Sequence, residues 1–159
     1  TLFAGISTCN AQKAPYPDAM TREASRKEGA KIFEKEFNQL NTDVEREDFA
    51  KKLIHLAIET DDDLNSKCAL LNIAKNIGVI INNYDIGMNA IELQTKTFEV
   101  SYEDLAIPFL EQLSPQKLTL SKLEQFVADI QIRQKLLIGT GDKFTTLAPP
   151  YTGTIQRTA

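Results

Sequence analysis

Tryptophan is absent from the sequence, and histidine and cysteine are rare. The 159 residues contain one histidine and two cysteines, Cys9 and Cys68. Two cysteines are too few for the disulfide framework that supports many small secreted folds. With 8% aromatic residues and no tryptophan, the chain also lacks the material for a surface on which sugars stack. A hydrophobic core must therefore hold the fold together, and the chain is long enough to build one.

Positive charge is scarce as well. The chain has 18 Lys and Arg residues against 22 Asp and Glu residues, which gives a formal net charge of −4. A mildly acidic chain without a basic block argues against nucleic acid and anionic membrane surfaces as partners. No apolar run approaches the roughly 20 residues that a membrane-spanning helix needs, so we expect no membrane span.

Residues suited to catalysis are few. His55 is the only candidate base for a hydrolytic triad, and Glu59 is its neighbour one helical turn later. Gly139-x-Gly141 follows a predicted helix and lacks a third glycine, so it fits a helix C-cap better than a dinucleotide loop. The acidic run 61–63 lacks the glycine and the spaced oxygens of a calcium loop. We therefore expect no enzyme activity, no catalytic residues, no cofactor and no metal site.

Apolar residues at helical spacing predict an all-α fold of about six helices. The most apolar long run is 62–82, where Leu71, Ile77 and Ile81 mark a stripe wide enough to need cover on more than one side. We expect this run to be the central helix, with the other helices packed around it as antiparallel hairpins in a repeat-like or bundle arrangement. Capping and turn signals place the helix starts near residues 19, 43, 63, 84, 101 and 121.

Two sequence features sharpen this prediction. Thr42 with Glu45, and Ser121 with Glu124, have the spacing of capping boxes at helix N-termini. A pair of glycines lies inside helical patterns, where each costs up to about 1 kcal/mol relative to alanine. We expect a close approach of two helix backbones as the reason. These glycines are Gly78 and Gly87.

The first helix is predicted to have one apolar and one charged face. Ala30, Phe33, Phe37 and Leu40 fall on the side expected to pack inward. The Arg, Lys and Glu residues between positions 22 and 31 are expected to form a solvated face of mixed charge, supported by favourable pairs one turn apart.

The two ends of the chain have a different composition from its middle. Residues 1–17 contain two prolines and no apolar period, which predicts an extended N-terminal arm. Residues 18–138 are predicted to be the helical-hairpin domain. Residues 139–159 are rich in Thr, Gly and Pro, which predicts an irregular, non-helical C-terminal tail with two short strands at most, at 144–147 and 151–155.

Predicted hairpin starts lie about 40 residues apart, which is the period of helical-hairpin repeats. Residues 70–98 resemble a tetratricopeptide-like unit. The stretches KEGAKIFEKEFNQ, FAKKLIHLAIETDDDLNSKCALLNIAKNIG and YDIGMNAIELQTKTFEVS resemble a helical module of exported planctomycete proteins. The resemblance implies an all-α repeat fold in an exported protein, and it implies no catalytic residues.

The N-terminal segment bears on the compartment. TLFAGISTC is similar to the end of a bacterial lipoprotein signal, with Cys9 as the lipid-modified residue. Thr8 fits that pattern poorly, so an ordinary export signal removed before Thr1 is the favoured interpretation. We expect an exported protein in a periplasm-like or other extracytoplasmic compartment, with lipid anchoring at Cys9 as the less favoured alternative. Cys68 lies on the apolar stripe and is expected to be a buried structural thiol.

Three functions remain open from the sequence. The leading one is a non-enzymatic interaction or assembly module, a scaffold or accessory subunit whose partner is a larger subunit or a second copy. The alternatives are an accessory N-terminal domain of a secreted enzyme and a small-molecule carrier with a pocket between helices. Side chains at turns and in the tail are predicted to contact the partner, with packing on their own domain as the alternative: Tyr84, Tyr102, Phe144, Leu147 and Tyr151.

Overall fold

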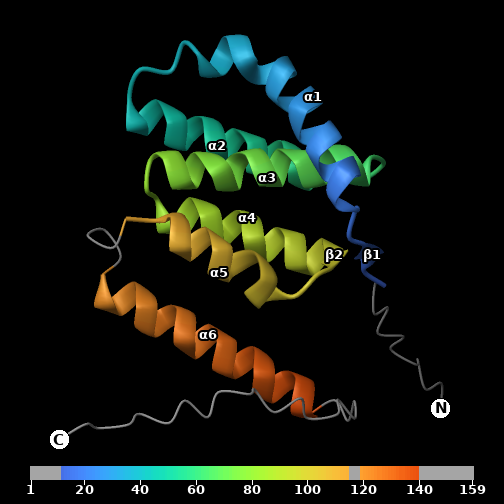
Figure 1. The fold of residues 1–159 in the computed structure, drawn as a ribbon, viewed down its shortest axis with the longest axis vertical. Coiled ribbons are helices and arrows are strands. Elements are labelled where there is room, and N and C mark those ends of the chain that lie inside the picture. Colours follow the sequence, from blue (N-terminus) through green and yellow to red (C-terminus); the bar gives the residue numbers. More distant parts are fainter. Residues whose placement is uncertain (1–11, 115–118, 140–159) are drawn as a thin grey trace, which may run out of the picture. The chain divides into compact units, whose positions relative to one another are not determined.

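The computed structural model describes residues 12–114 and 119–139. In these two ranges the regular structure is six helices and two strands of two residues each, so the all-α prediction is confirmed (Figure 1). The helices are α1 (Ala19–Phe37), α2 (Asp43–Glu59), α3 (Leu64–Ile80), α4 (Tyr84–Thr97), α5 (Tyr102–Gln112) and α6 (Leu120–Gly139), and the strands are β1 (Ala14–Pro15) and β2 (Phe98–Glu99).

Contacts divide the chain into two compact units, Thr1–Leu120 and Ser121–Ala159. The described part of the second unit is residues 121–139, which belong to α6. This helix exposes several large hydrophobic side chains, among them Leu123, Val127 and Ile132. Nothing tests the predicted domain boundaries after residues 17 and 138, and they stay predictions. None of the described helices combines the length and the hydrophobicity that crossing a membrane requires.

Helix α3 is the centre of the first unit. Helices α1, α2, α4 and α5 all pack against it, and α2 and α4 lie along its two sides (Figure 1). Leu71, Ile77 and Ile81 are buried, as the apolar stripe predicts. Leu64 and Ile80, which have the same period, are 39% and 60% exposed. The stripe therefore reaches the surface at both ends of the helix.

Helix α1 does not form a simple hairpin with α2. It packs chiefly on α3, which it crosses near Gly29, where an added Cβ would lie 3.1 Å from Cδ1 of Ile73. Its contacts with α2 gather around Phe49, whose ring centroid lies 5.8 Å from that of Phe33. The well-packed neighbours in this unit are thus α2 with α3 and α3 with α4.

The glycines inside α3 and α4 face each other where the two helices meet. A Cβ added to Gly78 would lie 3.0 Å from the backbone nitrogen of Gly87 and 3.2 Å from the carbonyl oxygen of Asn83. Real Cβ atoms almost never come so close to a backbone, so no larger residue fits at Gly78 without moving a helix. The predicted close approach is confirmed.

One predicted capping box is present and the other is wrong. Thr42 Oγ1 accepts from the backbone N–H of Glu45 at 3.2 Å, and Glu45 Oε2 accepts from that of Thr42 at 2.9 Å. Helix α6, in contrast, begins at Leu120, so Ser121 lies within its first turn. The helix begins one residue before the serine because the apolar Leu120 already belongs to its helical period. The capping pattern alone did not indicate this earlier start.

Candidate functional site

The predicted contact residues fall into two groups. Tyr84 and Tyr102 are only 5% and 4% exposed, because each ring packs into the first unit at the start of its helix. Little of either ring is left for a partner to touch, which matches the alternative that both pack on their own domain. The other three residues, Phe144, Leu147 and Tyr151, lie outside the described residues, as does Cys9.

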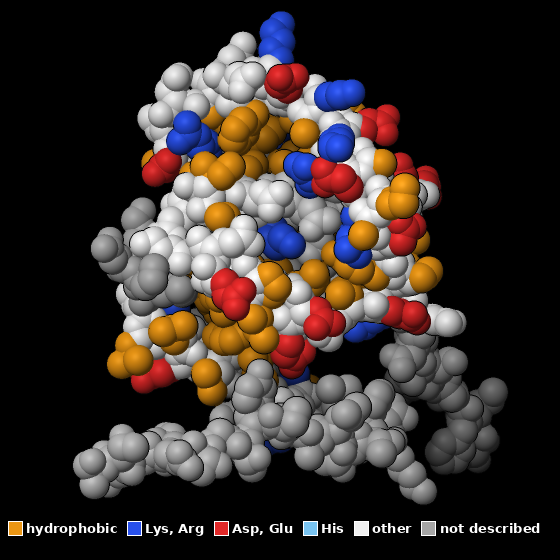
Figure 2. Space-filling view, viewed as in Figure 1, with side chains coloured by type: hydrophobic (Ala, Val, Ile, Leu, Met, Phe, Trp, Pro, Cys, Tyr) orange, Lys and Arg blue, Asp and Glu red, His pale blue; other side chains and the backbone are white. Residues whose placement is uncertain are grey.

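A largely apolar groove lies between α1 and α3. It encloses about 510 Å³ and includes Phe49 of α2 in its floor. Figure 2 shows hydrophobic side chains gathered in a hollow near the top of the viewed face, with basic and acidic side chains at its rim. We call this opening the α1–α3 groove. Its lining residues are Arg26, Ala30, Lys31, Phe33, Glu34, Phe37, Asn38, Phe49, Ile73, Asn76, Ile77 and Ile80.

The walls of the groove follow from helical spacing. Both helices place lining residues at intervals of three and four, from 30 to 37 on α1 and from 73 to 80 on α3. The apolar side of α1 is therefore only partly covered, and no residue of α1 is fully buried. Phe33, Phe37 and Leu40 are half-buried against the core, as predicted, whereas Ala30 is exposed, which contradicts the prediction for that residue. The crossing of α1 over α3 leaves this part of the apolar face open along the groove.

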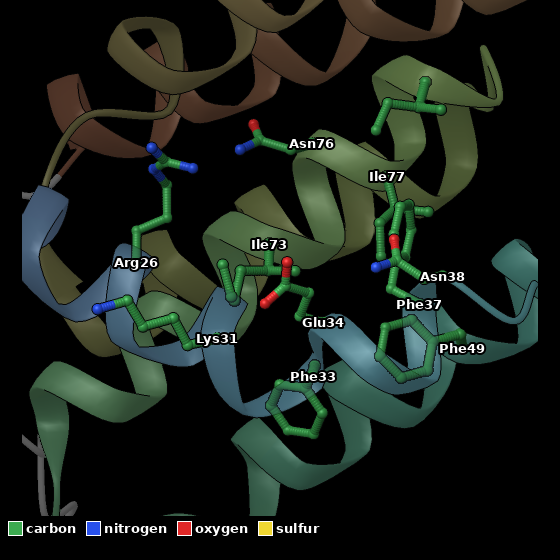
Figure 3. Close-up of a pocket in the computed structure, with 12 residues that line it drawn as sticks. Arg26, Lys31, Phe33, Glu34, Phe37, Asn38, Phe49, Ile73, Asn76 and Ile77 are labelled. Atoms are coloured by element: carbon green, nitrogen blue, oxygen red, sulfur yellow. The ribbon is translucent and has the colours of Figure 1, made fainter.

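One end of the groove is polar. In Figure 3 the side chains of Arg26, from α1, and Asn76, from α3, lie at that end, while Phe37 and Ile77 lie toward the other end. Arg26 and Asn76 also line a neighbouring cavity of about 250 Å³. We call it the polar cavity, and its lining residues are Ala19, Arg22, Glu23, Arg26, Asn72 and Asn76.

The N-terminal arm positions Arg22 at this cavity. Strand β1 pairs in parallel with β2, with Ala14 opposite Phe98, and the ring of Tyr16 packs edge-on against Phe98 at 5.8 Å between centroids. The guanidinium carbon of Arg22 lies 4.5 Å from the centroid of Tyr16, and Nη1 of Arg22 donates to the carbonyl of Pro17 at 2.8 Å. Arg22 is thus held by a stacked ring and a backbone acceptor.

A chain of polar side chains runs from Asn72, in the cavity lining, to the buried Gln94 and Cys68. Nε2 of Gln94 donates to Oδ1 of Asn72 at 3.1 Å, and Nδ2 of Asn72 donates to Sγ of Cys68 at 3.4 Å. Burial raises the pKa of the Cys68 thiol, and burial also raises the pKa of Tyr16 beside it. The buried structural thiol predicted at Cys68 is therefore confirmed.

Lys75 lies one turn after Asn72 on α3. Burial lowers the pKa of its ammonium group, and the positive charge of Arg22 lowers the pKa further. Among the described residues, neither Lys75 nor Arg22 forms a salt bridge with a carboxylate. Arg26 differs, because it makes two hydrogen bonds to Glu23, at 2.9 and 2.8 Å.

The sequence did not indicate this cluster, because it assigned Arg22 and Arg26 to a solvated face. Both residues are half-buried, whereas their neighbours Glu23 and Lys27 are exposed. One signal was available: Asn72 and Asn76 are two amides one turn apart in the otherwise most apolar helix. Such a pair indicates a polar face on a core helix, although it does not identify what lies opposite.

Other candidate chemistry stays on the surface of the described chain. His55 is exposed, with Nε2 3.3 Å from Oε1 of Glu59. Asp63 caps α3, and Asp61 forms a salt bridge with Lys67 at 3.2 Å. Within the described ranges, no three His, Cys, Asp or Glu residues come together in a way that could hold a metal ion.

No protein-family profile matches the sequence, and the comparisons with curated proteins and with solved structures give no match. The resemblance to a tetratricopeptide-like unit and to the exported planctomycete module therefore stays a prediction.

Proposed function

We propose that the protein is a non-enzymatic interaction module, and that its α1–α3 groove takes an apolar, helix-forming segment of another polypeptide. The observation that carries this proposal is the open apolar face of α1. Phe33 and Phe37 line a groove of about 510 Å³ with Ile73, Ile77 and Ile80 opposite, and no residue of α1 is fully buried. Hydrophobic surface left open in this way is typical of binding grooves.

The shape of the groove favours a helix as occupant. Its two walls are themselves helices, each with apolar residues at intervals of three and four, and a third helix fits between such ridges. Amphipathic helices bind in grooves of this kind by placing residues at i, i+3, i+4 and i+7 in the apolar floor. Arg26, Lys31 and Glu34 at the edge would meet the polar side of that helix.

The experiment compares two exposed isoleucines. Ile80 lines the groove and is 60% exposed, and Ile58 on α2 is 51% exposed and lines none of the described cavities. Because both side chains face solvent, replacing either by Asp should leave the fold intact, which circular dichroism checks. The tagged full chain and both variants are then recovered from the native host, and the bound proteins are quantified by mass spectrometry.

We expect Ile80→Asp to lose a protein that the wild type and Ile58→Asp both retain. The lost protein should contain an apolar helix-forming segment, and a synthetic peptide of that segment should bind the wild type and not Ile80→Asp. Equal recovery of every bound protein by the two variants would contradict the proposal.

A carrier of small apolar molecules is the second candidate function. The volume of the groove lies within the range of about 300–1,000 Å³ found for small-molecule sites. Native mass spectrometry of protein from the host distinguishes the two. A bound mass of a few hundred daltons that is absent from Ile80→Asp would favour the carrier. The accessory role beside a secreted enzyme and the exported location both stay predictions.

A further inference from the structure

We infer that the polar cavity binds an oxyanion, and that the segment taken by the α1–α3 groove presents a carboxylate there. This inference rests on the proposed function and adds the chemistry of the partner: an apolar helix with an acidic side chain or its terminal carboxylate at one end. The cavity and the groove share Arg26 and Asn76 in their lining, so one ligand can occupy both.

Half-buried positive charge lies at the polar cavity without a carboxylate of its own. Arg22 lines the cavity and is half-buried, and no described carboxylate forms a salt bridge with it. The carboxylate in the lining, that of Glu23, is bonded to Arg26. Positive charge removed from water without a counter-charge is unfavourable. The chain as a whole carries a net charge of −4, so this cluster does not follow from its composition. A bound anion would supply the missing negative charge.

The cavity also has more hydrogen-bond donors than acceptors to receive them. The guanidinium of Arg22 has five N–H groups, and the hydrogen bond to Pro17 uses one. The amide of Asn72 is already directed to Cys68 and to Tyr16, whereas Asn76 adds an exposed amide to the lining. Gln94 holds the amide of Asn72 in place through its own Nε2. A carboxylate, which accepts at both oxygens, fits such a set of donors.

The fold holds Arg22 in place before any ligand binds. The β1–β2 pair places Tyr16 against Phe98, and the guanidinium of Arg22 rests on the ring of Tyr16. A guanidinium held in one position loses less conformational freedom when it binds a carboxylate. The arm at residues 12–17 therefore has a role in building the cavity.

The experiment is a titration of the full chain, labelled with nitrogen-15 and followed by NMR. Sodium acetate, sodium phosphate and sodium chloride are added in separate series at constant ionic strength, and the signals of Arg22 Nε and the Asn72 side-chain amide are followed. Arg22→Gln and Asn76→Ala are titrated in the same way. Asn76 is exposed, so its variant keeps the test possible if Arg22→Gln does not fold. Lys31→Gln, in the groove but outside the polar cavity, is the control.

We expect acetate to shift both signals to saturation in the wild type and in Lys31→Gln, with affinity reduced roughly tenfold or more in Arg22→Gln and reduced in Asn76→Ala. Shifts that do not saturate, that chloride reproduces, or that only phosphate produces would overturn the inference. If acetate does not bind but Ile80→Asp still loses the partner, the inferred carboxylate on the partner is wrong and the proposed function stands. Saturation by acetate without any partner loss in Ile80→Asp would contradict the proposed function alone.

Discussion

The ring of Phe109 in α5 lies directly over the backbone of Gly87 in α4. A Cβ placed on Gly87 would lie 2.7 Å from Cε1 of Phe109 and closer still to two other ring carbons. Since the opposite side of the same turn meets Gly78, Gly87 is in contact with helices on two sides. The missing side chain at position 87 is what allows α3, α4 and α5 to pack together.

Gly87→Ala should therefore destabilise the fold by about 1–3 kcal/mol, the usual cost of forcing extra atoms into a packed core. Gly29→Ala is the matched control, because its Cβ would meet only the end of the Ile73 side chain, at 3.1 Å, and alanine is the better helix former. Urea denaturation of the two variants measures both effects. A Gly87→Ala protein as stable as the wild type would show that the ring moves aside easily.

Three carboxylates at helix N-termini should make the free energy of unfolding fall at acid pH. Hydrogen bonds from the start of the helix lower the pKa of Asp18, Glu45 and Asp63 below the ordinary carboxyl values. As pH falls, these carboxylates take up protons in the unfolded chain first. Their contribution to stability is thus complete above the ordinary values and is lost as pH falls through the lowered ones.

The measurement is urea denaturation between pH 7 and pH 2 for the wild type and for Asp63→Asn. Asparagine keeps a capping oxygen but does not titrate. The variant should therefore lose less stability than the wild type over the acid range. Identical pH profiles would mean that Asp63 does not contribute.

Lys75 is expected to cost stability while it is charged. Lys75→Met keeps the aliphatic part and removes the buried charge, so it should stabilise the protein by on the order of 1 kcal/mol when no anion is added. Because the folded pKa is lowered, the benefit should shrink as pH rises through that value, where the wild-type lysine becomes neutral. Lys31→Met, at an exposed position, serves as the control in thermal denaturation. A destabilised Lys75→Met would instead mean that its ammonium group has a stabilising partner.

Cys68 should be inert in the folded protein. The side chain is 1% exposed, and burial raises the pKa of its thiol, which keeps it protonated. In a Cys9→Ser background, modification by a thiol reagent should follow the fraction of unfolded protein as urea is added. Rapid modification in native buffer would show that the region around Asn72 opens without global unfolding.

Local signals in the sequence predicted much of the fold. The capping box at Thr42 and Glu45, the central helix and the paired glycines Gly78 and Gly87 are each encoded within a few residues, and each is confirmed. The failure at Ser121 was local as well, because an apolar residue before the serine already belongs to the helix. Helical period and capping chemistry are short-range properties, which a single sequence retains.

The candidate site could not be predicted in the same way. It depends on α1 crossing α3 and on the pairing of β1 with β2, which brings Tyr16 from the start of the chain against Phe98. No spacing within one helix indicates that Arg22 and Arg26 are half-buried while Glu23 and Lys27 beside them are exposed. The long-range pairing of β1 with β2 therefore determines which charged residues line the polar cavity in a fixed position.

The most direct test of the groove is a photo-crosslink from its edge. The full chain is expressed in its native host with benzoylphenylalanine at position 80 or, as the control, at position 58. We predict that position 80 gives a defined covalent adduct whose cross-linked peptide is an apolar, helix-forming segment, and that position 58 does not. No adduct from position 80, or the same adduct from both positions, would contradict the assignment of the α1–α3 groove as the binding site.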